Sequence, residues 1–220
     1  REARRMSVRS LDFAEPFFPV RYLVDEAEYE VGAKSIVLNL SPAGIAVRHQ
    51  VLGFFRSAVF ANVTLFGAAR CLVIEDFEKA GDLEPLFAAI RRKWTLVYEA
   101  TKLERHRGVQ LYRSPKIRIG DVEVNMCFVD SVPLNVGLHR THWGDAAFRE
   151  VHTQILGYGR MQQFAERDLS TLYREDPMAP GCTHEPMYDD AWIYPWHQYE
   201  PYTKGVFLAT EMGGSEEPGA

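Results

Sequence analysis

The chain gathers five of its seven histidines between residues 139 and 197, in a stretch with the local pattern of β-strands. They are His139, His142, His152, His184 and His197. Residues 150–156 read Glu-Val-His-Thr-Gln-Ile-Leu, and alternate side chains of a strand point to opposite faces of a sheet. Glu150, His152 and Gln154 therefore share one face. A strand that carries an acid, an imidazole and an amide on one face either meets water there or lines a polar cavity.

Short β-rich runs separated by turn residues surround this strand and predict a sheet-rich second half. The runs cover residues 109–112, 116–119 and 121–128. Ile119-Gly120-Asp121 is typical of a hairpin turn. One face of the following strand is apolar, with Val122, Val124, Met126 and Phe128. Gly157 and Gly159 predict a second tight turn, after which residues 160–164 return as the partner strand of 150–156.

The first half of the chain combines strand signals with one clear helix. Residues 34–40 predict a strand, whereas residues 54–66 fit a buried strand or a buried helix. Asp82 can cap the helix and Pro85 suits its first turn. The apolar face of that helix contains Leu83, Leu86, Phe87, Ile90, Trp94 and Val97.

These elements predict a mainly β architecture in three segments. Residues 1–108 form a β-rich extension that carries the outer amphipathic helix, residues 82–101, and packs on the second half. Residues 109–212 form an antiparallel barrel. Residues 213–220 are a polar tail that we expect to be disordered. Because the first half has no second histidine cluster, the sequence does not indicate a duplicated barrel.

Composition narrows the classes of partner. The formal net charge is −5, and no basic stripe indicates nucleic-acid binding. No apolar run approaches the roughly 20 residues of a membrane helix. The three cysteines are odd in number and widely spaced, which favours a reduced, cytoplasmic protein. We expect a small-molecule substrate and a homodimer, without nucleic acid or membrane as a partner.

Two short motifs resemble those of the cupin superfamily of metal-binding β-barrels. Glu150, six residues and then Gly157 match the second half of the first cupin motif, with histidines just before it. Pro195-Trp196-His197, followed by the apolar strand of residues 206–209, is similar to the second motif. The family's usual His-x-His pair is replaced by His139-x-x-His142. The resemblance implies a cupin-like antiparallel β-barrel of the jelly-roll type.

The resemblance also implies a divalent metal and an enzyme. The ligands would come from His139, His142, Glu150, His152 and His197. Iron(II) is favoured, and zinc, manganese or nickel suits the same donors. The implied function is a metal-dependent enzyme acting on a small polar metabolite, with a non-haem iron dioxygenase, an oxidoreductase, favoured. A lyase, an isomerase and a non-catalytic binding protein remain alternatives.

Several charged and histidine side chains lie near the motifs in the sequence and have expected roles of their own. Glu150 and Arg160 are the predicted catalytic residues, Glu150 being either a ligand or a general base. Arg140 or Arg149 could receive a substrate carboxylate. We expect His184 to be a loop residue rather than a ligand, and the isolated His106 to lie in a surface loop.

Overall fold

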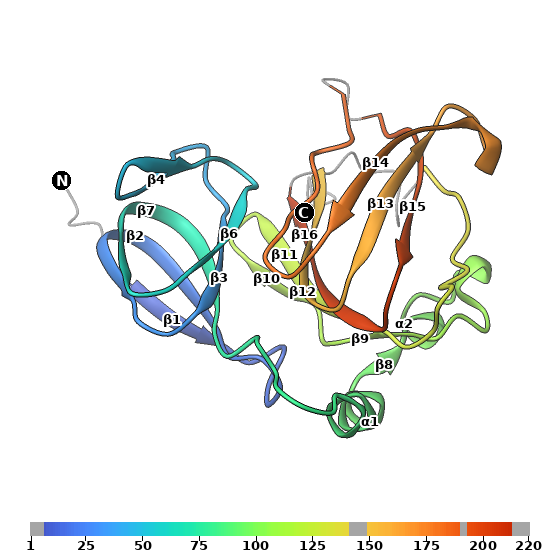
Figure 1. The fold of residues 1–220 in the computed structure, drawn as a ribbon, viewed down its shortest axis with the longest axis horizontal. Helices are drawn as coiled ribbons and strands as arrows, with labels where there is room; N and C mark the ends of the chain where they lie inside the picture. Colours follow the sequence, from blue (N-terminus) through green and yellow to red (C-terminus); the bar gives the residue numbers. More distant parts are fainter. Residues whose placement is uncertain (1–6, 141–148, 190–192, 213–220) are drawn as a thin grey trace, which may run out of the picture.

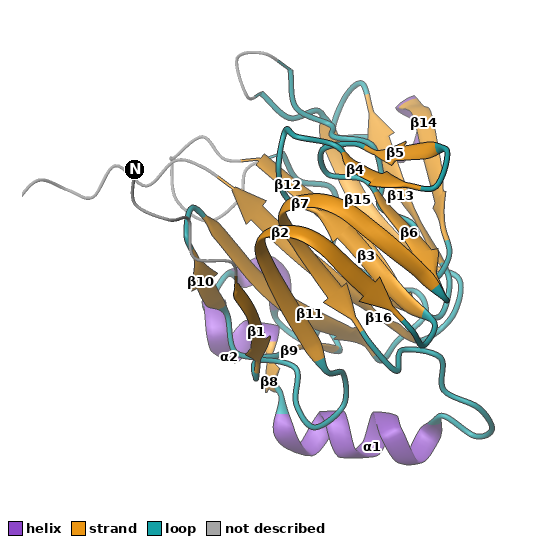
Figure 2. Cartoon of the chain, turned by 90° about the vertical axis from the view of Figure 1, so that its left-hand side faces the viewer, coloured by secondary structure: helices purple, strands orange, loops and turns teal. Residues whose placement is uncertain are grey.

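The computed structural model describes residues 7–140, 149–189 and 193–212, and its strands form three antiparallel sheets (Figures 1 and 2). The seven-stranded sheet, here sheet A, has the order β1-β2-β7-β3-β6, with β4 paired to β7 and β5 to β4. Its strands are β1 (Ser7–Leu11), β2 (Val20–Val31), β3 (Ser35–Asn39), β4 (Ile45–Val47), β5 (Gln50–Leu52), β6 (Ser57–Phe60) and β7 (Val63–Ile74). The strand predicted at residues 34–40 is β3, and the ambiguous stretch 54–66 contributes β6 and the start of β7.

The second half of the chain supplies the other two sheets. Sheet B has the order β12-β16-β11-β9-β8, with β10 also paired to β11, and sheet C has the order β14-β13-β15. Sheet B contains β8 (Thr95–Leu96), β9 (Leu111–Arg113), β10 (Ile117–Ile119), β11 (Val122–Val129), β12 (Arg149–Leu156) and β16 (Gly205–Met212). Sheet C contains β13 (Gly159–Phe164), β14 (Leu172–Met178) and β15 (Trp196–Pro201). The mainly β class and the antiparallel pairing are therefore confirmed.

The helix expected over residues 82–101 is interrupted at Trp94. Helix α1 (Glu84–Lys93) ends there, β8 follows, and α2 (Val97–Thr101) begins a separate turn; the short helices η1 (Glu104–His106) and η2 (Leu169–Thr171) lie farther along the chain. Trp94 is extended, and its buried ring meets Phe17 edge to face with 5.8 Å between the ring centroids. The pairing of β8 with β9 and the burial of this tryptophan outweigh the helical pattern of the sequence.

A large apolar core lies between sheets A and B and is closed by α1. The apolar face predicted for residues 122–128 lies in this core: Val122, Val124, Met126 and Phe128 are all buried there. Alternate residues of β12 and β16, such as Val151 and Leu208, join them. Phe87 of α1 stacks on Phe128 with 4.7 Å between the ring centroids. One face of sheet B is thus buried in this core.

The hairpin predicted across Gly157 is wrong, because the two flanking strands belong to different sheets. Strand β12 pairs with β16, whereas β13 pairs with β14 and β15. Gly157 has a φ of +72°, and a Cβ there would lie 2.3 Å from the carbonyl oxygen of Lys204. This glycine therefore lets the chain cross from sheet B to sheet C in close contact with the start of β16. The hairpin predicted at Gly120 is confirmed, since β10 pairs with β11.

Among the described residues, no helix is long and apolar enough to cross a membrane.

Candidate functional site

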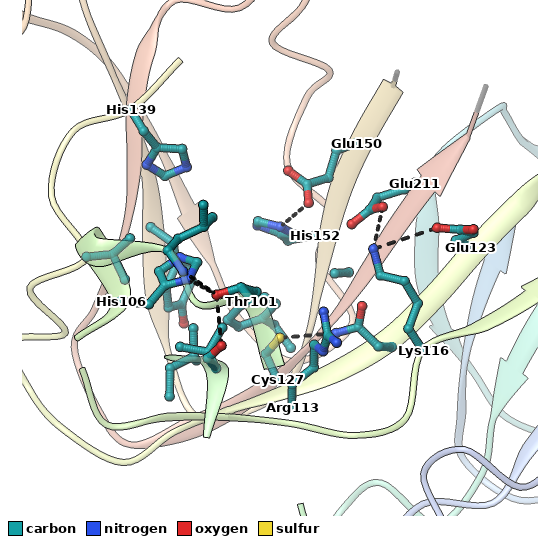
Figure 3. A pocket seen from close by; sticks show the side chains of 18 of the residues that line it. Thr101, His106, Arg113, Lys116, Glu123, Cys127, His139, Glu150, His152 and Glu211 are labelled. Atoms are coloured by element: carbon teal, nitrogen blue, oxygen red, sulfur yellow. Dashed lines mark hydrogen bonds and ion pairs between the residues drawn. The ribbon is translucent and has the colours of Figure 1, made fainter. Parts of the chain in front are cut away.

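A cavity of about 400 Å³ lies between the second face of sheet B and the inner face of sheet C (Figure 3). The same strands that fill the core with one set of residues line the cavity with the other. In β11, for example, Glu123, Asn125 and Cys127 face the cavity. The volume falls within the range of small-molecule sites in proteins. Sheet B therefore separates an apolar core from a cavity that is lined by both charged and apolar groups.

The cavity lining combines charged groups with an apolar surface. The charged and imidazole side chains are Arg105, His106, Arg113, Lys116, Arg118, Asp121, Glu123, His139, Glu150, His152, His197 and Glu211. The apolar contribution comes from Val97, Leu103, Leu111, Leu134, Val136, Met161, Phe207 and Ala209. A molecule held here would meet both kinds of surface.

Two of the predicted histidines are brought together by a short stretch of backbone pairing. The amides of His139 and His197 each donate to the other's carbonyl oxygen, at 3.1 and 2.9 Å. Their ring centroids are 4.4 Å apart. The Nδ1 of His139 lies 3.1 Å from the carbonyl oxygen of Gly137, and that of His197 lies 2.9 Å from the carbonyl oxygen of Pro195. A carbonyl can only accept, so each Nδ1 carries the proton and each Nε2 carries the lone pair.

Glu150 and His152 form a second group on β12, where Figure 3 shows them across the cavity from His139. As the alternation of the sequence predicts, both side chains line the cavity. His152 Nε2 lies 3.4 Å from Glu150 Oε1, and both side chains are largely buried. The backbone amide of Glu150 donates to the hydroxyl of Tyr194 at 2.8 Å. The His152 ring lies against Phe207, with 4.7 Å between the centroids, which fixes its plane.

His184 lies beside this group but serves the structure. Its Nε2 accepts the backbone amide of His152 at 2.9 Å, and its Nδ1 donates to the carbonyl oxygen of Glu185 at 2.7 Å. Both ring nitrogens are therefore engaged with backbone. Burial, and secondarily the charge of His152, lowers the pKa of His184 to about 4, so the ring is neutral near pH 7. A neutral ring without a spare lone pair does not suit metal ligation.

Three glutamates lie side by side on adjacent strands. Glu150 of β12 is opposite Glu211 of β16, which is opposite Glu123 of β11. Lys116 donates to Glu211 at 2.6 Å and lies 3.8 Å from Glu123 (Figure 3). Burial, followed by the charge of Glu150, raises the pKa of Glu211, while Lys116 acts in the opposite direction. One lysine thus partly neutralises a row of three carboxyl groups.

A chain of hydrogen bonds forms the opposite wall and includes His106, which is buried rather than in a surface loop. The Thr101 hydroxyl donates to the carbonyl oxygen of Val97 at 2.9 Å and accepts from His106 Nδ1 at 2.7 Å. His106 Nε2 then accepts from Arg105 Nε at 3.2 Å. Burial and the charges of Arg105 and Arg113 lower the pKa of His106 to about 4. The sequence signal for this wall was weak, because a lone histidine among charged residues is typical of a loop.

The arginines expected near the site lie elsewhere. Arg160 alternates with the cavity residue Met161, so it lies on the outer face of sheet C, 3.0 Å from Glu175 and over the ring of Tyr202. Arg160 is therefore not among the residues that line the cavity, and its catalytic role stays a prediction. Arg140 and Arg149 are also outside the cavity lining, and their guanidinium groups lie over the rings of Trp196 and Tyr188. Instead, Arg105, Arg113 and Arg118 are the arginines that line the cavity.

The predicted metal ligands are only partly assembled. The donor chemistry fits a divalent metal, and two imidazoles are oriented as ligands usually are, through a hydrogen bond from the other ring nitrogen. Within residues 7–140, 149–189 and 193–212, however, no group of three or more His, Cys, Asp or Glu side chains is placed to hold a metal ion. His142, the remaining predicted ligand, lies outside the described residues.

No protein-family model and no curated protein matches the chain. Among solved structures, salicylate 1,2-dioxygenase from Pseudoaminobacter salicylatoxidans has a TM-score of 0.35 at 8% identity, covering 90% of this chain and 68% of its own. HEPD from Streptomyces albus has a TM-score of 0.33 at 9% identity, covering 97% of this chain and 77% of its own. Vicilin from Solanum lycopersicum has a TM-score of 0.35 at 10% identity, covering 98% and 82%. The chain is thus similar to this degree both to enzymes and to a vicilin.

Proposed function

We propose that the chain is a metal-dependent enzyme of the cupin type, acting on a small polar molecule in the cavity between sheets B and C. The observation that carries the proposal is the pairing of His139 with His197. Each ring donates through Nδ1 to a backbone carbonyl, and both side chains line the cavity. A hydrogen bond from Nδ1 to a backbone carbonyl fixes the tautomer and the orientation of metal-binding histidines.

The metal would be held by His139 and His197, with further donors from Glu150, His152 and His142. Imidazole and carboxylate donors suit iron(II), and also zinc, manganese or nickel. A metal bound by such residues supplies a Lewis acid, and iron in addition supports oxygen chemistry. Among the reaction classes we favour an oxygenase, with a lyase or an isomerase as the alternative.

The chain's own residues would handle protons and charge. Glu150 Oε1, with His152 Nε2 3.4 Å away, is placed to take a proton from a bound molecule and to share it with the imidazole. Lys116 limits the repulsion between Glu150 and the neighbouring Glu211 by its bond to the latter. The apolar part of the lining excludes water around the reacting group, which strengthens these interactions.

A binding protein without a metal is the second candidate. It is favoured by the finding that three donors do not converge in the described parts of the chain. In that case the cavity would hold its ligand unchanged, and the Glu150–His152 pair would contribute hydrogen bonds only.

Metal analysis separates the two candidates. Chain prepared without chelator and supplied with iron(II) or zinc is expected to hold one divalent ion, and His197→Ala is expected to lose most of it. His49→Ala is the matched control, because His49 is an exposed histidine on the turn of the β4–β5 hairpin. If the native chain retains no metal under these conditions, the enzyme proposal is wrong.

Turnover is tested with metal-loaded protein in cell extract, with and without oxygen, by mass spectrometry of small molecules. A metabolite consumed by native protein but not by Glu150→Gln supports an enzyme. Consumption that requires oxygen and iron supports an oxygenase, whereas equal consumption with zinc in the absence of oxygen supports a lyase or an isomerase. A metabolite that is retained but never converted supports the binding protein.

A further inference from the structure

The geometry points to a carboxylate-binding subsite at Arg113 and Arg105, and we propose that the cavity takes a small monocarboxylic acid with an apolar body. The inference rests on the proposed function for the use of this cavity and names the class of molecule bound there. It places the acid group on the wall formed by β9 and η1.

Arg113 differs from Lys116 and Arg118, two other cations of the lining, in how its positive charge is neutralised. Lys116 is bonded to Glu211, and Arg118 lies 3.2 Å from Glu123. Arg113 is half-buried, lies opposite Cys127 in the sheet, and has no carboxylate partner within the described parts of the chain. A guanidinium that is partly removed from water without a counter-charge is a strong site for an anion, and its planar fork matches the two oxygens of a carboxylate.

Arg105 is fixed beside it by the hydrogen-bond chain from Val97. The Thr101 hydroxyl is bonded to the carbonyl oxygen of Val97, His106 is bonded to Thr101, and Arg105 Nε donates to His106. Because His106 is the neutral member of the chain, it orients the guanidinium without adding a charge of its own. Arg105 and Arg113 both line the cavity, and the charges of both lower the pKa of His106. The subsite is therefore preorganised before a ligand arrives.

The remaining lining defines what the acid group is attached to. Leu111 lies on the same strand as Arg113, and Val136 and Phe207 contribute further apolar surface to the cavity. Glu150 and Glu211 lie elsewhere in the lining and repel a second negative charge. The site therefore favours a monoanion with a hydrophobic body over a dicarboxylate or a sugar phosphate.

Cyclohexanecarboxylate and cyclohexanecarboxamide are suitable probes, because they share a shape and differ in charge. Calorimetric titration of the full chain, in buffer with chelator, is expected to show the acid binding at least about tenfold more tightly than the amide. Arg113→Gln should reduce this ratio below about twofold, and Arg113→Lys, which keeps the charge but not the fork, should give an intermediate ratio. Arg174→Gln is the control: Arg174 lies on β14 and pairs with Asp176 at 3.0 Å, so the ratio should be unchanged.

A measurement on the native chain makes the test independent of how the variants fold. Phenylglyoxal modification of Arg113, followed by peptide mass spectrometry, should be slowed by the acid but not by the amide. Equal binding of the two probes by native protein, or an unchanged ratio in Arg113→Gln, overturns the subsite. Since the titrations contain chelator, a chain that binds no metal but still prefers the acid contradicts the proposed enzyme and leaves the subsite standing.

Discussion

The two faces of sheet B are built from the same strands but differ in almost every physical respect. The face toward sheet A is apolar and closed, with Phe128, Val151 and Leu208 fully buried. The face toward sheet C carries Glu150, Glu211 and other ionisable groups around a cavity. Alternation along a strand makes this division possible, because neighbouring residues point in opposite directions. One face can therefore supply stability while the other holds groups that folding alone would not favour.

On the cavity face, burial shifts the pKa values of ionisable side chains away from their ordinary values. Burial raises the pKa of the Cys127 thiol to about 12 and, with the charges of Arg105 and Arg113, lowers that of His106 to about 4. In each case the charged form is disfavoured by loss of water. Clusters of groups with perturbed pKa values in a cavity are typical of functional sites.

The largest contrast is expected from removing one aromatic ring on each face. Phe128→Ala should lower the free energy of unfolding by about 3–5 kcal/mol, because the ring is fully buried and stacks on Phe87. Phe207→Ala should cost clearly less, since Phe207 borders an existing cavity, and should weaken binding of the cyclohexyl probes. Urea unfolding and calorimetry measure both effects. Equal losses of stability would contradict the view that the core face of sheet B supplies more stability than the cavity face.

The pH dependence of stability provides a second comparison, smaller in size. The pKa of His106 is about 4 in the folded chain, against an ordinary value of 6.5 in the unfolded chain. Between these two values the unfolded chain therefore binds more protons than the folded chain. Stability should therefore fall as the pH drops from about 6.5 to about 4, by about 1.4 kcal/mol for each unit of pKa difference. His106→Gln should make urea-unfolding curves less dependent on pH in this window, whereas the exposed control His49→Gln should not. The same dependence in both variants would contradict a buried, neutral His106.

The smallest effect is expected at Arg160, on the outer face of sheet C. Arg160→Gln removes a partly exposed ion pair with Glu175, so the free energy of unfolding should change by less than about 1 kcal/mol. Metal content and the acid-to-amide binding ratio should be those of the native chain. A loss of either property would support the catalytic role that the sequence predicts for Arg160.

The elements that the sequence predicted well are those fixed by local pattern. The alternation of residues 150–156 correctly placed Glu150 and His152 in a cavity, and Gly120 marked its hairpin. The pairing of β12 and β13 was predicted wrongly, because a glycine turn does not reveal whether the chain returns to its own sheet or crosses to another. The face that Arg160 occupies could not be predicted for the same reason, since it depends on the sheet that the strand joins.

The missed part of the site comes from long-range packing. Arg105, His106 and Arg113 precede the histidine-rich stretch by tens of residues, and nothing in their spacing connects them to it. Only the order of strands in sheet B, with β8 and β9 beyond β11, brings them to the cavity. The whole three-segment division remains a prediction, although the cavity draws residues from both sides of the boundary proposed at residue 108.

The short chain of contacts from Val97 through Thr101 and His106 to Arg105 has a practical consequence for dissecting this protein. A fragment that starts at residue 109 would keep both motifs, the paired histidines and Arg113, yet it would lack strand β8 and the part of the cavity wall that contains Thr101, Arg105 and His106. Such a fragment, or a chimera joined at that point, would preserve both sequence motifs while losing Arg105 and the hydrogen-bonded residues that orient it. A chimera that exchanges the complete cavity between related chains would have to be joined before β8, where α1 ends.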